Sequence, residues 1–154
     1  MNTLRVCNRQ KIRAVNTPRL RQIAAHLVRH ELGWTDYELA LHLVGPDEMA
    51  RLNQQFLGHE GSTDVITFDY REQPGAWRGE IFISIADALA QGREFGCAWQ
   101  EEVARYAVHG LLHLAGYDDT QPALRRVMKR QENKLLKALS SRFELRTLAR
   151  RKNV

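Results

Sequence analysis

Several features of secreted and membrane proteins are scarce in this chain. Its 154 residues include only two cysteines, Cys7 and Cys97, so no disulfide framework is possible and we expect no disulfide partner for either. No apolar run approaches the roughly 20 residues that span a bilayer. The segment from Met1 to Arg5 has no hydrophobic signal region. We therefore expect a cytoplasmic protein with no membrane partner.

Acidic side chains are scarce at both ends of the chain. Residues 1–30 contain arginine and lysine but no acid, and residues 142–154 contain one acid, Glu144, among five basic side chains. The formal net charge is +5. Such ends attract polyanions, of which nucleic acid is the commonest, or they simply keep the surface solvated. Charge alone leaves both interpretations open.

The hydrophobic fraction of 44% and the charged fraction of 27% are typical of a globular protein. We expect one domain over residues 1–154, with a basic C-terminal tail at about 142–154. Alternating apolar residues predict four strands, at 3–8, 37–44, 64–70 and 79–85. Helical spacing predicts five helices, which begin at Thr17, Asp47, Ala86, Trp99 and about Pro122. This order favours an α+β fold with helices packed on the sheet.

Helical periodicity also predicts which side chains face the core. On the second helix these are Met49, Leu52 and Phe56. The apolar side of the last helix should comprise Leu124, Val127, Met128, Leu135 and Leu139. Thr17, just before Pro18, is expected to cap the first helix.

One stretch has the spacing of a metal site. His109 and His113 are four residues apart, so they lie on one face of the predicted helix. Gly116 can end that helix with a positive φ and turn the chain back, which brings Asp119 toward the two imidazoles. The resulting pattern, H-x-x-x-H-x-x-G-x-x-D, has the spacing of the metzincin pattern, in which a third His takes the last position.

The helix that carries these histidines is apolar nearly all round and should be buried. The remaining stripe consists of Glu102, Tyr106, His109 and His113. Glu102 lies about 10 Å along the axis from His109, too far for the same ion. Two imidazoles and one carboxylate suit Zn²⁺ and leave a coordination position open, although Fe²⁺ and Mn²⁺ accept the same ligands. We predict one zinc ion per chain, held by His109, His113 and Asp119.

The general base of zinc peptidases is absent. Zincins place Glu directly after the first His, where this chain has Gly110. A zinc peptidase is therefore the weakest of the functions considered. Weak candidates for the missing catalytic group are Asp118, Tyr117 and the substrate's own phosphate.

Three sequence blocks resemble the YbeY family of bacterial rRNA maturation factors. The family signature H-G-x-L-H-L-x-G-Y-D-H matches at every fixed position of residues 109–119 except the last. Residues 52–56 and 62–68 resemble the family's L-N-x-x-[YF] and T-D-V-L-S-F, and residues 79–84 resemble its G-D-I-x-I-S strand. Together the blocks cover roughly residues 37 to 132.

The resemblance implies a zincin-like α+β fold with a mixed sheet and a zinc-dependent endoribonuclease specific for single strands. It implies action on the 3′ end of small-subunit rRNA and in ribosome quality control, with single-stranded rRNA and the small subunit as partners. The family's metal ligands correspond to His109, His113 and Asp119. A ribosome-assembly or RNA-binding factor with a structural metal is the alternative.

The chain departs from the family at two positions. Asp119 replaces a His, which lowers the net charge of the metal site from about +2 to about +1 and should acidify a water there less. Leu57 replaces an Arg associated with catalysis, and leucine cannot neutralise a phosphate. His59, two residues later, and an arginine from the basic ends of the chain are the candidate substitutes.

The loop from Tyr70 to Arg78 interleaves aromatic and basic residues. Single-stranded RNA is bound by base stacking and phosphate contacts, so Arg71, Trp77 and Arg78 are candidate substrate-binding residues. The competing interpretation is a loop whose tryptophan covers the sheet.

Overall fold

Four strands form one mixed sheet in the residues that the structure, a computed structural model, describes, 2–58 and 63–149. The sheet order is β1 (Thr3–Asn8), β2 (Tyr37–Val44), β4 (Trp77–Ser84) and β3 (Val65–Asp69). β1 and β4 pair parallel with β2, whereas β3 is an antiparallel edge strand beside β4. The predicted α+β class and mixed four-stranded sheet are confirmed.

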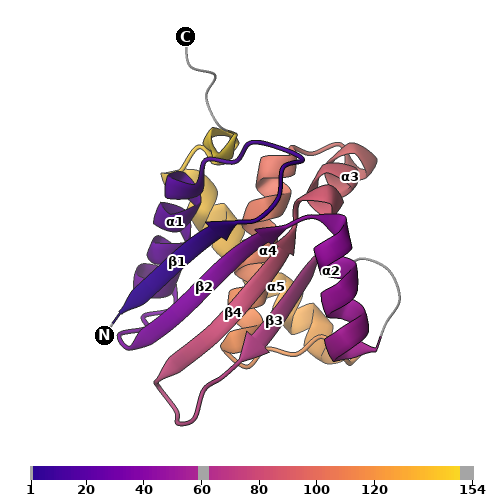
Figure 1. Cartoon of the computed structure of the whole chain (residues 1–154). Helices are drawn as coiled ribbons and strands as arrows, with labels where there is room; N and C mark the ends of the chain where they lie inside the picture. Colours follow the sequence, from indigo (N-terminus) through magenta and orange to yellow (C-terminus); the bar gives the residue numbers. More distant parts are fainter. Residues whose placement is uncertain (1, 59–62, 150–154) are drawn as a thin grey trace.

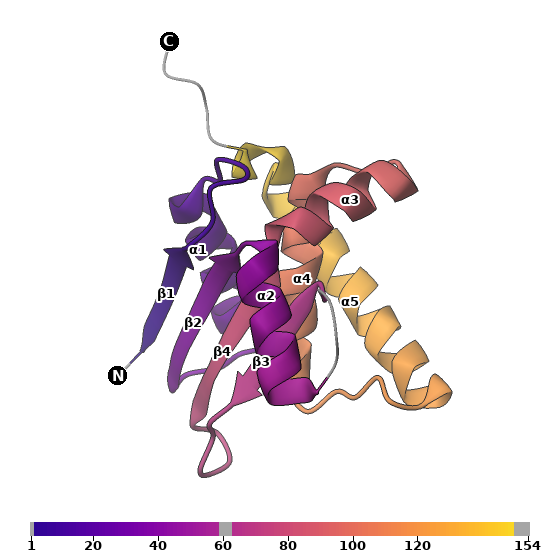
Figure 2. The same cartoon turned by 45° about the vertical axis from the view of Figure 1, so that its right-hand side comes forward.

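Five α-helices surround this sheet in the described ranges. They are α1 (Thr17–His26), α2 (Pro46–Leu52), α3 (Ile85–Phe95), α4 (Trp99–Leu114) and α5 (Pro122–Arg142). Short π-helical turns, η1 (Leu27–Glu31) and η2 (Asn53–Leu57), extend α1 and α2, and a 3-10 turn, η3 (Leu145–Leu148), follows α5. Figures 1 and 2 show α1, α4 and α5 behind the sheet and α2 on its other side.

Alternation along the strands divides the core between these two layers. Leu39, Leu41 and Leu43 belong to the large cluster with α1 and α4, as do Ile81 and Ile83. A smaller cluster on the opposite face contains Val44, Met49, Ile66 and Phe82. The sheet is thus buried on both faces near its centre, which suits the nearly continuous apolar run of β2.

Some predicted positions are wrong. Phe56 lies in η2, where its ring contacts Phe68 of the edge strand β3 but remains 53% exposed. Leu124 and Val127 are exposed because the first turns of α5 extend away from the sheet, and Met128 is the first buried side chain of that helix. Asn16, not Thr17, caps α1, since its side chain accepts a hydrogen bond from the Arg19 backbone N–H.

The chain returns to its beginning after α5. Leu145 and Leu148 are buried in the large core, and the Leu148 carbonyl accepts a hydrogen bond of 2.8 Å from the Asn16 backbone N–H. An isolated bridge pairs Val15 with Ala149. Among the described residues, no helix has both the length and the apolar character needed to cross a membrane.

Candidate metal centre

Helix α4 presents His109 and His113 at the edge of the core. Most of its other side chains are fully buried, so packing fixes the direction of the two imidazoles. A Cβ at Gly110 would lie 2.7 Å from Ile81 Cγ2. Position 110 therefore faces β4 at close approach, and a carboxylate base at this position has no room.

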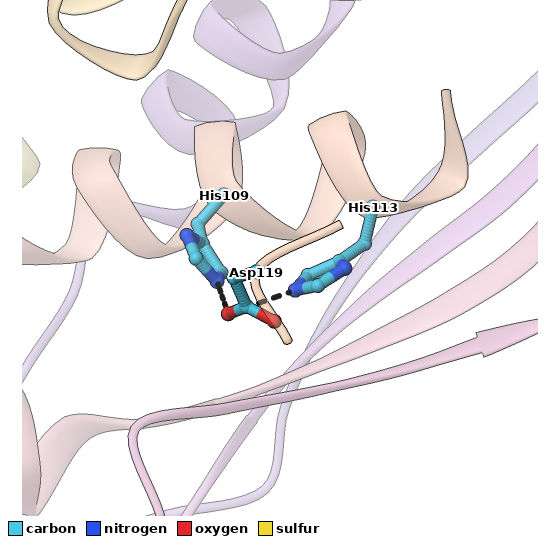
Figure 3. A group of neighbouring side chains, drawn as sticks. All are labelled: His109, His113 and Asp119. Atoms are coloured by element: carbon cyan, nitrogen blue, oxygen red, sulfur yellow. Dashed lines mark ion pairs between the residues drawn. The ribbon is translucent and has the colours of Figure 1, made fainter. Parts of the chain in front are cut away.

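The turn after α4 brings the third side chain back. Gly116 has a φ of 103°, which L side chains rarely adopt, and the Tyr117 backbone N–H donates to the Leu112 carbonyl at 3.0 Å. The chain then reverses, and Asp119 lies between the two imidazoles (Figure 3). The predicted turn at Gly116 is thus what places the carboxylate.

The three candidate ligand atoms form a compact group. The distance from Asp119 Oδ2 to His109 Nε2 is 3.5 Å, and that to His113 Nε2 is 3.6 Å. All three ligand atoms lie within 4.8 Å of one another. Tetrahedral zinc with bonds of about 2.0–2.1 Å requires ligand atoms about 3.3–3.4 Å apart, and the two distances to Asp119 Oδ2 are close to that value. The predicted meeting of these three side chains is confirmed, and their binding of zinc remains a prediction.

Glu132 of α5 was not predicted, and it holds His109 from behind. Its carboxylate is buried and accepts hydrogen bonds from His109 Nδ1 at 2.9 Å, Arg105 Nη1 at 2.8 Å and Lys129 Nζ at 3.2 Å. Burial alone would raise the pKa of Glu132, but the hydrogen bonds from His109 and Arg105 outweigh it and lower the pKa to about 2. Carboxylates of this kind orient metal-ligating histidines. The available signal was an acid on the apolar side of the last helix, four residues after Met128.

The pKa values of the two histidines shift in opposite directions. Burial disfavours the charged form of His109, but Glu132 and Asp119 more than compensate, so its pKa is raised. Burial, followed by the charge of His109, lowers the pKa of His113. His113 is therefore neutral at neutral pH, as a metal ligand must be.

The weak catalytic candidates lie next to the group but point elsewhere. Asp118 accepts hydrogen bonds from the Thr120 backbone N–H at 2.9 Å and its hydroxyl at 3.0 Å, and these bonds lower the pKa of Asp118. Tyr117 packs partly against the large core. Neither belongs to the compact three-residue group.

The first half of the α4 stripe that carries the histidines is buried under neighbouring helices. Glu102 and Tyr106 were expected to share an exposed stripe with the histidines, but both are buried, because α3 and α5 pack over this part of α4. A cavity of about 270 Å³ remains between these helices, and His109 and Asp119 line one side of it. A second cavity, of about 510 Å³, lies against Arg5, Tyr70 and Arg78 and includes none of the three candidate ligands.

The described residues that were predicted to bind substrate do not line the cavity beside the candidate ligands. Arg78 pairs with Asp36 at 2.9 Å, Trp77 stacks on Trp34 with ring centroids 4.0 Å apart, and Arg71 lies 4.6 Å above the Trp77 ring. Leu57 is half exposed at the end of η2. His59 lies outside the described residues.

Known proteins resemble this chain in both sequence and fold. The model of the family described as endoribonuclease YbeY matches residues 5–140. An endoribonuclease YbeY of Salinibacter ruber is 37% identical over 135 residues, covering 82% of this chain and 85% of the relative. One of Chlorobaculum parvum is 38% identical over 110 residues, covering 71% of this chain and 77% of the relative. The solution structure of TM1509 from Thermotoga maritima has a TM-score of 0.65 at 28% identity and covers 90% of both chains.

Proposed function

Since this chain belongs to the endoribonuclease YbeY family, we propose that it is a zinc-dependent endoribonuclease that cleaves single-stranded RNA. We propose as its substrate the 3′ end of small-subunit rRNA, during maturation and quality control of the ribosome in the cytoplasm. The observation that carries the proposal is the compact group of His109, His113 and Asp119 at the edge of a cavity.

The donor set fits one zinc ion. Both histidines present Nε2 to the same side as the Asp119 carboxylate, and three protein ligands leave a position free, as catalytic zinc sites require. A zinc ion here would act as a Lewis acid toward a phosphate oxygen and would lower the pKa of a water molecule. Glu132 keeps the His109 proton on Nδ1 and so leaves Nε2 free for the ion.

The base that removes a proton from the nucleophile is a separate question. Gly110 contacts Ile81 and supplies none, which counts against a zinc peptidase. Asp118 and Tyr117 remain our candidates, although the lowered pKa of Asp118 makes it a weak base. Alternatively the phosphate itself accepts the proton. A 2′,3′-cyclic phosphate on the product would identify the RNA 2′-OH as nucleophile, and a linear phosphate would identify water.

The second candidate function is a ribosome-assembly or RNA-binding factor with a structural metal. Leu57, where the family has Arg, and Gly110 both favour it, because each removes a group that could act on the phosphate. The enzyme is favoured by the fourth coordination position, which three protein ligands would leave free on a zinc ion.

Cleavage of single-stranded RNA from the 3′ end of small-subunit rRNA tests the proposal. Wild type and the exposed-site control Glu94→Gln should cleave it, and His113→Ala should not. Zinc content is measured on all three by mass spectrometry. Equal cleavage by wild type and His113→Ala would overturn the proposal, whereas binding without cleavage in every variant would favour the assembly factor.

A further inference from the structure

The cavity beside the candidate metal centre is larger than an ordered water site. Its volume of about 270 Å³ far exceeds the roughly 10–15 Å³ that one ordered water molecule needs. Helix α4 supplies Tyr106 and His109, helix α5 supplies Arg125 and Glu132, and Asp119 closes the side next to the candidate ligands. A group bound in this cavity would therefore be held directly against the metal centre.

Tyr106 lines the cavity and carries a buried hydroxyl that is an unused hydrogen-bond donor. Its side chain is 3% exposed, and its hydroxyl has no hydrogen-bond partner among the described residues. Burial, together with the nearby carboxylates of Asp64 and Glu102, raises the pKa of Tyr106, so the hydroxyl keeps its proton. Buried polar groups normally have a partner, so a ligand oxygen that reaches this O–H would satisfy it.

Arg125 differs from the other cations that line the cavity. Arg105 donates to Glu132 at 2.8 Å and lies 3.7 Å from Glu102, and Lys129 donates to Glu132 at 3.2 Å, so both cations already have acidic partners. Arg125 Nε donates to the backbone carbonyl of Asp119 at 3.2 Å, and the described residues give Arg125 no acidic partner. Its guanidinium is thus tethered next to a candidate metal ligand, with donors left for an anion.

The carboxylates of the cavity determine which part of a ligand goes where. Asp64 and Glu102 line the cavity together with the buried Tyr106, and their charges act on its hydroxyl; we call this the inner part, and its carboxylates disfavour a phosphate there. A neutral sugar or base has donors for these carboxylates and acceptors for the Tyr106 hydroxyl. The exposed Arg125, at the first turns of α5, suits a phosphate at the mouth.

We propose that this cavity is a subsite for one nucleotide of an RNA strand, in which Arg125 binds a backbone phosphate beside the metal centre and the Tyr106 hydroxyl donates to an oxygen of the sugar or base. The inference rests on the proposed function, because it takes RNA as the ligand. Arg125 then supplies a positive charge at the phosphate, which Leu57 does not provide.

Binding of a short single-stranded RNA to the full-length protein tests the subsite. Fluorescence anisotropy is recorded before and after removal of metal with a chelator, and electrophoresis verifies that the RNA stays intact. Arg125→Gln should weaken binding about ten-fold or more and reduce the slope of the salt dependence by roughly 0.7 for each phosphate that is no longer bound. Arg126→Gln, a neighbouring exposed arginine that does not line the cavity, should stay within about two-fold. Equal effects of the two variants would overturn the proposal.

Tyr106→Phe tests the inner part of the subsite, and phenylalanine fits the same space. Affinity should fall about three- to ten-fold while the salt dependence is unchanged, because only a neutral donor is removed. Unchanged affinity would overturn the role of the hydroxyl. A polyglutamate peptide that competes as well as RNA does would overturn the assignment to a nucleotide.

The same variants separate this inference from the proposed function. RNA that binds through Arg125 and Tyr106 but is not cleaved supports the subsite and contradicts the nuclease. Cleavage that neither substitution affects, with RNA affinity unchanged, contradicts the subsite and supports the nuclease.

Discussion

Basic side chains lie both in the segment from Arg71 to Arg78, which runs from the β3–β4 loop into β4, and in the first turns of α5, but these side chains differ in what they already bind. In the first segment, Arg78 pairs with Asp36, and Arg71 lies against Trp77, which also stacks on Trp34. In α5, Arg125 donates to a backbone carbonyl and faces a cavity. A phosphate must displace an existing partner in the first region and need not do so in the second. An RNA-binding surface is therefore better identified by basic side chains with free hydrogen-bond donors than by the number of basic side chains.

The largest effect is expected for a substitution at the candidate metal centre, next to the cavity that Arg125 faces. His113→Ala removes one of three candidate ligands, so zinc affinity should fall more than 100-fold and cleavage should disappear. Competition with a chromophoric chelator measures the affinity. His30→Ala, an exposed histidine on η1, is the matched control and should retain full zinc content. Stoichiometric zinc in the His113→Ala protein would contradict the assignment of the site.

A smaller loss of zinc affinity is expected for Glu132, which contacts the candidate ligand His109 and is not itself a candidate ligand. Glu132→Gln keeps the shape but removes the negative charge that orients His109, so zinc affinity should fall about 10- to 100-fold. The same chelator competition measures it, with Glu94→Gln as control. An unchanged affinity would mean that packing alone orients the imidazole.

The contribution of Glu132 to stability should depend on pH, and acid titration of the metal-free protein tests this. The pKa of Glu132 is lowered to about 2 from an ordinary value of 4.5, so its contribution to stability is present above pH 4.5 and is lost as pH falls toward 2. We expect the contribution to be on the order of 2 kcal/mol, because solvent screens part of the interaction. Urea unfolding of wild type and Glu132→Gln at several pH values gives the difference. A difference that does not shrink below pH 4 would contradict the prediction.

The smallest effect is expected in the segment from Arg71 to Arg78. Arg78→Gln should cost less than about 1 kcal/mol of stability, as exposed ion pairs do, and should leave RNA affinity within about two-fold. Thermal unfolding and anisotropy measure the two quantities. A loss of RNA affinity as large as that of Arg125→Gln would instead make the loop a wall of the RNA groove, the other prediction from its sequence.

What the sequence could predict depends on how local each feature is. The approach of His109, His113 and Asp119 follows from the periodicity of one helix and the turn at one glycine, all within eleven residues. Glu132 contacts His109 across 23 positions, and only the packing of α5 on α4 reveals it.

The errors on α5 and η2 have the same origin. Periodicity identified an apolar side that includes Leu124, but it could not show that the first turns of the helix stay exposed. It likewise could not show that Phe56, whose ring contacts Phe68 of β3, stays half exposed. The cavity is lined by residues of several helices, so the spacing of residues within one helix could not have predicted it.

The return of the chain from Leu148 to Asn16 joins two segments that the sequence separates by more than 130 positions. Basic residues from both segments, such as Arg13 and Arg146, therefore share one end of the molecule. Figure 2 shows that end opposite the connection between α4 and α5, and the 16 residues of α4 separate the two by roughly 20 Å. An RNA strand attracted by the basic end must extend along the molecule before it meets the metal centre. We therefore expect long strands to associate faster than short ones, and added salt to remove that advantage.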